Sequence, residues 1–169
     1  MFLTLAEEQF GPRDRSWTFI GIHVGMQPGS RTLPDVACSH VSIELASRIL
    51  NSPEGSLYEL AHETVHLLGP SDICTRLEEG VAVVFSDRMM EWSFALRDYS
   101  NDRLRGAKNY RAAAEDVRIL LASYPDVIRQ VREVEPTFGR IRYEHFETLF
   151  PGIDAALVGR LLQPFPAAF

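Results

Sequence analysis

Residues 52–70 read SPEGSLYELAHETVHLLGP, and this stretch decides how the rest of the chain is interpreted. Ser52 is a typical N-cap with Pro53 in the first helical position, and Gly69-Pro70 is a typical helix stop. Apolar side chains between these signals recur at the helical period, at Leu57, Leu60, Ala61, Val65 and Leu68. The stretch therefore predicts an amphipathic helix whose apolar face packs on a core.

The same helix carries two histidines and a glutamate in the pattern HExxH, at residues 62–66. His62 and His66 are four residues apart, so they lie on one face of the helix with their Cβ atoms about 5–6 Å apart. Two imidazoles in this arrangement can bind one zinc ion at about 2.0–2.1 Å. Glu63 then lies beside the metal, where it can take a proton from the water that zinc activates.

A zinc site of this kind needs at least one more protein ligand. The next apolar segment starts with Leu77-Glu78-Glu79-Gly80-Val81-Ala82 and predicts a buried helix from near Arg76 or Leu77 to about Leu96. Adjacent helical side chains point about 100° apart, so only one of the two glutamates can face the metal. Both could instead simply favour the positive helix N-terminus, but beside HExxH the ligand hypothesis is preferred.

The residues HETVHLLGP and RLEEGVA resemble the gluzincin metallopeptidases, over about residues 57–87. In that family one helix carries HExxH and a second helix supplies a glutamate ligand. Glu79-Gly80-Val81-Ala82 looks like the E-G-x-A of aminopeptidase N-like members, which aligns the ligand with Glu79 and leaves Glu78 to cap the helix or meet a substrate amine. The resemblance implies peptide-bond hydrolysis with one Zn²⁺ per chain, with His62, His66 and Glu79 as ligands and Glu63 as general base.

Two features depart from that family. The interval from His66 to Glu79 is shorter than in thermolysin-like or aminopeptidase N-like enzymes, so the connection must be a tight loop. Thermolysin-like enzymes also carry an aspartate four residues past the glutamate ligand, where this chain has Val83. Because such partners orient the ligands and change metal affinity by about 10–100-fold, we expect Asp87 or a backbone carbonyl to replace it.

An oxyanion that develops during hydrolysis needs a donor besides the metal. By the resemblance, this donor is a tyrosine or histidine from a later segment. Tyr110, which opens an apolar helix, is the first candidate, followed by Tyr143 and His145.

Strands are expected in the first fifty residues. Trp17–Val24 is β-branched and aromatic, and a Pro28-Gly29 turn signal follows it. Val41, Ile43 and Leu45 alternate with polar residues as in a half-buried strand, although this segment also fits a helix running to Leu50. The resemblance makes this strand a candidate sheet edge on which an extended peptide docks, with Val41 and Ile43 as contacts, and an internal strand without a ligand is an equal alternative.

Prolines punctuate the second half of the chain into short helical segments. Further helices are expected at about residues 106–124, 126–134, 143–150 and 153–162. The predicted class is α+β, with a small N-terminal mixed β-sheet packed on a helical body, as in a minimal gluzincin-like domain. We expect one domain over residues 1–169, made of a sheet region (about 1–50), the zinc-binding helices (53–97) and C-terminal helices (106–163).

Composition restricts the partners and the location. The net charge is −6 and the longest apolar run is Val81–Phe85, so we expect a peptide or protein substrate and neither nucleic acid nor membrane. Two cysteines, Cys38 and Cys74, suit a reducing, cytoplasmic compartment, and the sequence leaves a bridge between them open. Cys74 is also an alternative thiolate ligand, less favoured than Glu79. The oligomeric state is not predicted.

Three classes of function fit these residues. The first is a zinc peptidase, and the second is a zinc hydrolase of another amide or ester, because water activation does not specify the scissile bond. The third is a binding or regulatory module without turnover. Glu63 argues against the third class, because a purely structural metal site needs no base beside it.

Overall fold

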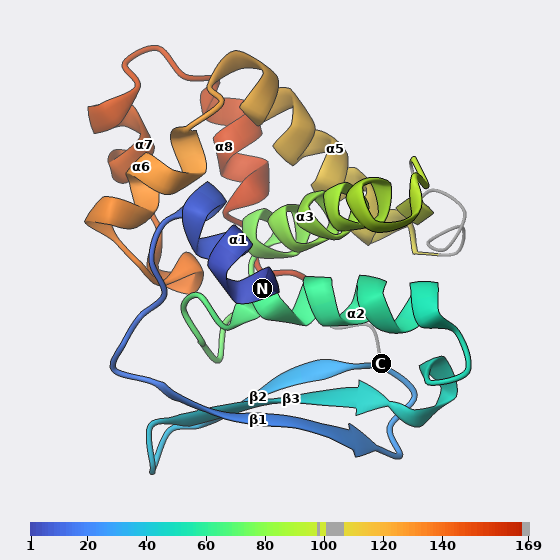
Figure 1. The fold of residues 1–169 in the computed structure, drawn as a ribbon. Coiled ribbons are helices and arrows are strands. Elements are labelled where there is room, and N and C mark those ends of the chain that lie inside the picture. The colour runs from blue at the N-terminus through green and yellow to red at the C-terminus, as the bar shows by residue number, and fades with distance from the viewer. Residues whose placement is uncertain (98, 101–106, 167–169) are drawn as a thin grey trace.

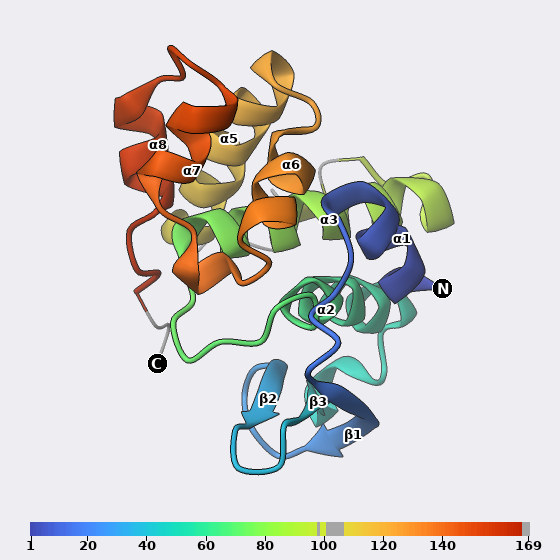
Figure 2. The ribbon, with the colours of Figure 1, turned by 90° about the vertical axis from the view of Figure 1, so that its left-hand side faces the viewer.

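The computed structural model describes residues 1–97, 99–100 and 107–166. The chain forms a three-stranded sheet with a helical body on one of its faces (Figure 1). Rotated by 90°, the helix that carries HExxH is seen nearly along its axis, between the sheet and the other helices (Figure 2). The α+β class expected from the sequence is therefore confirmed.

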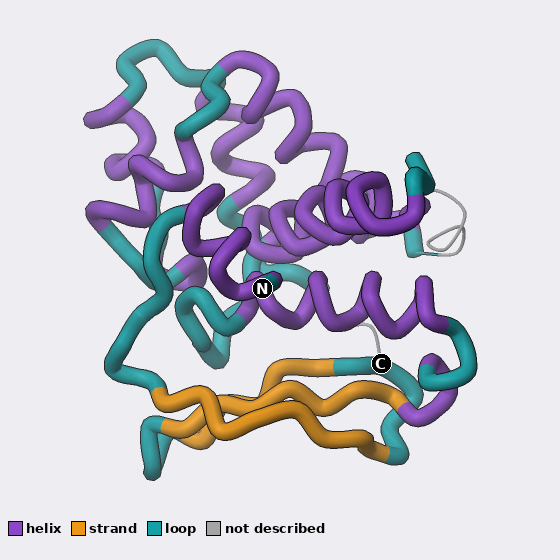
Figure 3. Tube along the Cα trace, viewed as in Figure 1, coloured by secondary structure: helices purple, strands orange, loops and turns teal. Residues whose placement is uncertain are grey.

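The sheet consists of β1 (Thr18–Gly25), β2 (Arg31–Asp35) and β3 (His40–Ala46) in the order β1-β3-β2. β3 runs parallel to β1 and antiparallel to β2, so the sheet is mixed, as expected. The strands form a layer of their own beneath the helices (Figure 3).

β3 is the central strand, which corrects one prediction. Its main chain pairs with β1 on one side and β2 on the other, and Val41 and Ile43 are each only 1% exposed. The prediction that this strand is a sheet edge, with Val41 and Ile43 as peptide contacts, is wrong, and the equal alternative of an internal strand is confirmed. The edges are β1 and β2. The sequence did not indicate β2, because this strand contains Pro34 and has charged ends, which are typical of a loop or an edge strand.

The helices agree closely with the predicted segments. They are α1 (Phe2–Phe10), α2 (Pro53–His66), α3 (Arg76–Phe94), α5 (Lys108–Ser123), α6 (Val127–Val134), α7 (Tyr143–Leu149) and α8 (Ala155–Leu161). The sequence did not indicate α1, and residue 106, where the third of the predicted helices was to begin, lies outside the described residues. In the described part of the chain, no helix combines the length and the apolar character needed to cross a membrane.

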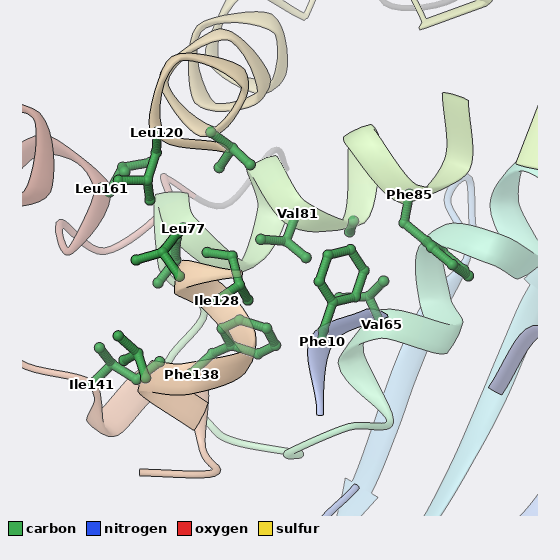
Figure 4. Close-up of a cluster of buried hydrophobic side chains, with 14 of the residues drawn as sticks. Phe10, Val65, Leu77, Val81, Phe85, Leu120, Ile128, Phe138, Ile141 and Leu161 are labelled. Carbon is green, nitrogen blue, oxygen red and sulfur yellow. The ribbon is translucent and has the colours of Figure 1, made fainter. Parts of the chain in front are cut away.

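α2 is buried on two sides, which fixes the position of its motif. On one side Val65 joins the main core with Phe10, Val81 and Phe85, none of them more than 1% exposed (Figure 4). On the other side a smaller apolar cluster links the helix end to the sheet, made of Val41, Ile43, Leu45, Ile49 and Leu67. The N-cap works as expected, because the Ser52 side chain accepts the Gly55 N–H at 3.0 Å.

Gly80 lets α3 and α5 approach each other closely. A Cβ at this position would lie 2.4 Å from the Ala113 carbonyl oxygen and 2.6 Å from Val117 Cγ2. Both distances are well below van der Waals contact, so glycine is required for this packing. The close approach matters for the site because α5 carries Tyr110 in its first turn.

Arg132 of α6 anchors the chain just beyond α2. It is 2% exposed, and its guanidinium donates to five carbonyl oxygens, those of Phe10, Gly11, Pro12, Leu68 and Pro136. Burial lowers the pKa of Arg132 to about 10, which still leaves it charged at neutral pH. The end of α1, the exit from α2 and the end of α6 are thereby tied together.

Candidate metal centre

The structure brings the three predicted ligands together between the end of α2 and the start of α3. Ligand atoms of His62, His66 and Glu79 all lie within 4.8 Å of one another. His62 Nε2 is 3.1 Å from Glu79 Oε2, and His66 Nε2 is 4.0 Å from Glu79 Oε1. Tetrahedral ligands at about 2.0–2.1 Å from zinc are roughly 3.3 Å apart. The observed separations bracket this value.

Glu79 provides an independent test of whether these residues fit a metal. Its side chain is buried, and its Oε2 atom has no hydrogen-bond partner although His62 Nε2 is 3.1 Å away. A carboxylate oxygen buried in this way needs a positive partner, which is either a protonated His62 ring or a cation bound by both side chains. Two imidazole nitrogens and one carboxylate match the donor set of catalytic zinc sites, which keep a fourth position for water. The residues therefore fit zinc.

Glu78 contacts His66, a role that the sequence did not predict. Its Oε1 atom is 2.7 Å from His66 Nδ1, and the side chain is 3% exposed. A carboxylate on Nδ1 fixes the ring and leaves Nε2 for a metal. Glu78 thus contacts a ligand through Oε1 and takes the orienting role expected of Asp87. Asp87 instead accepts hydrogen bonds from Ser100 and Arg118.

Electrostatics in the cluster favour a cation. Burial opposes a charge on His66, but the Glu78 carboxylate outweighs it and raises the pKa of His66 to about 10. Burial also opposes a charge on His62, yet Glu79 raises its pKa. For Glu79 burial opposes ionisation, but the imidazoles lower its pKa to about 2. A protonated His66 therefore faces an ionised Glu79 at neutral pH, and a divalent cation bound between them would displace the proton from His66 Nε2.

Glu63 lies beside the cluster and has a partner that the sequence did not indicate. The Thr32 hydroxyl of β2 is 2.9 Å from Glu63 Oε2 and 3.0 Å from the Glu63 carbonyl oxygen. Burial raises the pKa of Glu63, against the opposing effect of the two nearby imidazoles. A buried carboxylate with a raised pKa is suited to accept and release a proton.

Tyr110 lies at the site, whereas the two other donor candidates do not. Its ring centroid is 6.1 Å from that of His62, and burial and nearby carboxylates raise the pKa of its hydroxyl, which stays a neutral donor. Tyr143 packs against the main core, and His145 accepts the Arg142 N–H at the start of α7. Neither of them lines the cavity formed by the described residues around the cluster.

The C-terminal segment holds Tyr110 from the other side. The Phe165 ring centroid is 4.6 Å from that of Tyr110, in an edge-to-face contact. The Phe165 N–H donates to the Cys74 carbonyl at 2.8 Å, and the Arg76 N–H donates to the Gln163 carbonyl at 2.9 Å. These bonds attach the segment to the loop that leads into α3.

Cys74 contacts the metal centre as a donor to a ligand. Its Sγ lies 3.3 Å from Glu79 Oε1, and burial together with Glu78 and Glu79 raises the pKa of the thiol. It also forms a second group of potential ligands with His66 and Glu78. Cys38 and Cys74 are both free, so the bridge that the sequence leaves open is absent.

A cavity of about 260 Å³ opens over the cluster. One wall is β2 and the residue before it, and the opposite wall is the loop between α2 and α3. Its lining consists of Ser30, Arg31, Thr32, Pro34, His62, Glu63, His66, Pro70, Ser71, Cys74, Glu78, Glu79 and Tyr110. The base, the three metal-binding side chains and the phenol are thus accessible from one space.

Comparison of the chain with protein-family models, with curated proteins and with solved structures found no match. The functional argument therefore depends on the site itself.

Proposed function

We propose that this protein is a zinc-dependent metallopeptidase of the gluzincin type. The observation that carries the proposal is the convergence of His62, His66 and Glu79, whose ligand atoms lie within 4.8 Å of one another in the lining of one cavity. A structural zinc site would use four protein ligands, whereas this set has three and opens into a cavity. Glu63 beside it supplies the base that hydrolysis needs.

The protein side of the mechanism follows from the positions of the side chains. Zinc, when bound, acidifies water and polarises a carbonyl group. Glu63 accepts a proton from the attacking water and passes it to the leaving amine. Tyr110 donates a hydrogen bond to the scissile carbonyl oxygen as negative charge develops on it. Glu78 keeps the His66 ring in its binding orientation.

The shape of the cavity supports a peptide as substrate. β2 is an edge strand, and its residues Arg31, Thr32 and Pro34 line the cavity that contains the metal centre. An extended peptide can add to such an edge through main-chain hydrogen bonds. Pro34 removes one main-chain donor from this strand, so the pairing would be short.

Three measurements test the proposal. Metal analysis of the purified protein should give about one zinc per chain. Glu63→Gln should keep the metal and abolish cleavage of a peptide library, whereas Glu79→Ala should lose the metal. Glu54→Gln, a glutamate change at the far end of α2, is the matched control and should behave as wild type.

Other outcomes separate the competing functions. Bound zinc with hydrolysis of non-peptide esters or amides, but not of peptides, would indicate a different hydrolase. Bound zinc without any turnover would indicate a binding or regulatory module. Cleavage that survives Glu63→Gln would contradict the assigned mechanism.

We also propose a cytoplasmic location, which the free thiols of Cys38 and Cys74 support.

A further inference from the structure

Thr32 forms a contact between the sheet and the HExxH helix that the resemblance does not explain. It lies in β2, 31 residues before Glu63, and its hydroxyl meets Glu63 twice. Oγ1 is 2.9 Å from the Oε2 atom of the carboxylate and 3.0 Å from the main-chain carbonyl oxygen. The same residue lines the cavity over the metal centre.

The second contact fixes the hydroxyl to the backbone of the helix. Glu63 is among the last four residues of α2, whose carbonyl groups lack the usual partner four residues ahead. Leu67 donates its N–H to the Thr64 carbonyl instead of that of Glu63. The Thr32 hydroxyl has one proton, which is shared between this carbonyl and the carboxylate, so the hydroxyl is held at a defined distance from Oε2.

We propose that Thr32 is a positioning residue that fixes the rotation of the Glu63 carboxylate. A hydroxyl donating to Oε2 leaves Oε1 free to take a proton from the attacking water and to pass it to the leaving amine. The contact holds whether Glu63 is ionised or protonated, because a carboxyl group protonated on Oε1 still accepts a hydrogen bond through Oε2. This inference rests on the proposed function, in which Glu63 is the general base.

The position of Thr32 in β2 gives the contact a second consequence. In the proposed function the substrate main chain lies along β2, so one strand both lines the substrate cavity and holds the base. β2 is itself held by pairing with the buried strand β3, where Thr32 is opposite Ile43. The orientation of the base is therefore set relative to the substrate and not only relative to α2.

Substitution of Thr32 separates this role from simple packing. Thr32→Val keeps the shape of the side chain but removes the hydroxyl, and Thr32→Ser keeps the hydroxyl. We expect Thr32→Val to lower kcat by roughly 10- to 100-fold, as for loss of other orienting partners, with KM and zinc content close to wild type. Thr32→Ser should restore most of kcat.

Thr64→Val is the matched control. It removes a buried hydroxyl from the residue next to Glu63, but that hydroxyl bonds the Leu60 carbonyl at 2.7 Å. It should leave kcat within about threefold of wild type, well short of the loss expected for an orienting partner. Equal losses in Thr64→Val and Thr32→Val, or a Thr32→Ser variant as slow as Thr32→Val, would overturn the proposal.

Crystal structures of the zinc-loaded wild type and of Thr32→Val give a readout that does not depend on activity. The wild type should show the Glu63 carboxylate in one orientation with Oε2 on Thr32, and the variant should show it rotated or in several orientations. An unchanged carboxylate in the variant would refute the positioning role. If the wild type cleaves no peptide, the proposed function fails, while this structural comparison still decides the role of Thr32.

Discussion

Zinc binding should release protons at neutral pH, and His66 should supply close to one of them. The pKa of His66 is raised to about 10, so its ring is protonated at pH 7, and Glu79 raises the pKa of His62 as well. Each ring must lose its Nε2 proton before it can bind a metal. The pKa of His66 lies about three units above pH 7, so removing its proton costs about 4 kcal/mol of the free energy of zinc binding at that pH. Zinc affinity should therefore rise with pH, by about tenfold per unit near pH 7 from His66 alone.

The cause of the shift can be tested directly with Glu78→Gln. Without the carboxylate 2.7 Å from Nδ1, the pKa of His66 should fall toward its ordinary value of about 6.5. The number of protons released at pH 7 should then fall by close to one. Calorimetric titration with zinc in buffers of different ionisation enthalpy measures this number. A wild type that releases no protons, or a variant that releases as many, would refute the reasoning.

Three further predictions concern the surroundings of the metal. Glu78→Gln should weaken zinc binding by roughly 10- to 100-fold in a competition titration after correction for proton competition, which reaches about tenfold for wild-type His66 even at pH 9 and is absent in the variant. A changed KM with unchanged zinc affinity would support the substrate role instead. Gly80→Ala should lower the free energy of unfolding by about 1–3 kcal/mol in denaturant melts, because its Cβ would lie 2.4 Å from a carbonyl oxygen of α5; a variant as stable as wild type would contradict this packing. Phe165→Leu should lower kcat roughly two- to tenfold by releasing Tyr110, since an aromatic pair contributes about 0.5–1.5 kcal/mol. In a Tyr110→Phe background, Phe165→Leu should not lower kcat further. An equal loss of kcat in that background would show that Phe165 does not act through Tyr110.

Sequence alone determined the features that depend on near neighbours in the chain. The caps and the apolar period over residues 52–70 define α2, and the four-residue spacing puts His62 and His66 on one face of it. The start of α3 is equally local, because the Thr75 side chain accepts the Glu78 N–H at 3.3 Å. These signals were sufficient for the α+β class and for the positions of most helices.

Tertiary structure decided which distant groups meet. Strand order made β3 central and turned β2, a segment with a proline and charged ends, into the edge beside the metal centre. Helix periodicity allowed only one of Glu78 and Glu79 to face the metal, and the packing of α3 on α2 set the other against His66. Thr32 reaches Glu63 across 31 residues of chain. Such contacts depend on how whole elements pack, and the local sequence around each residue carries no signal for its partner.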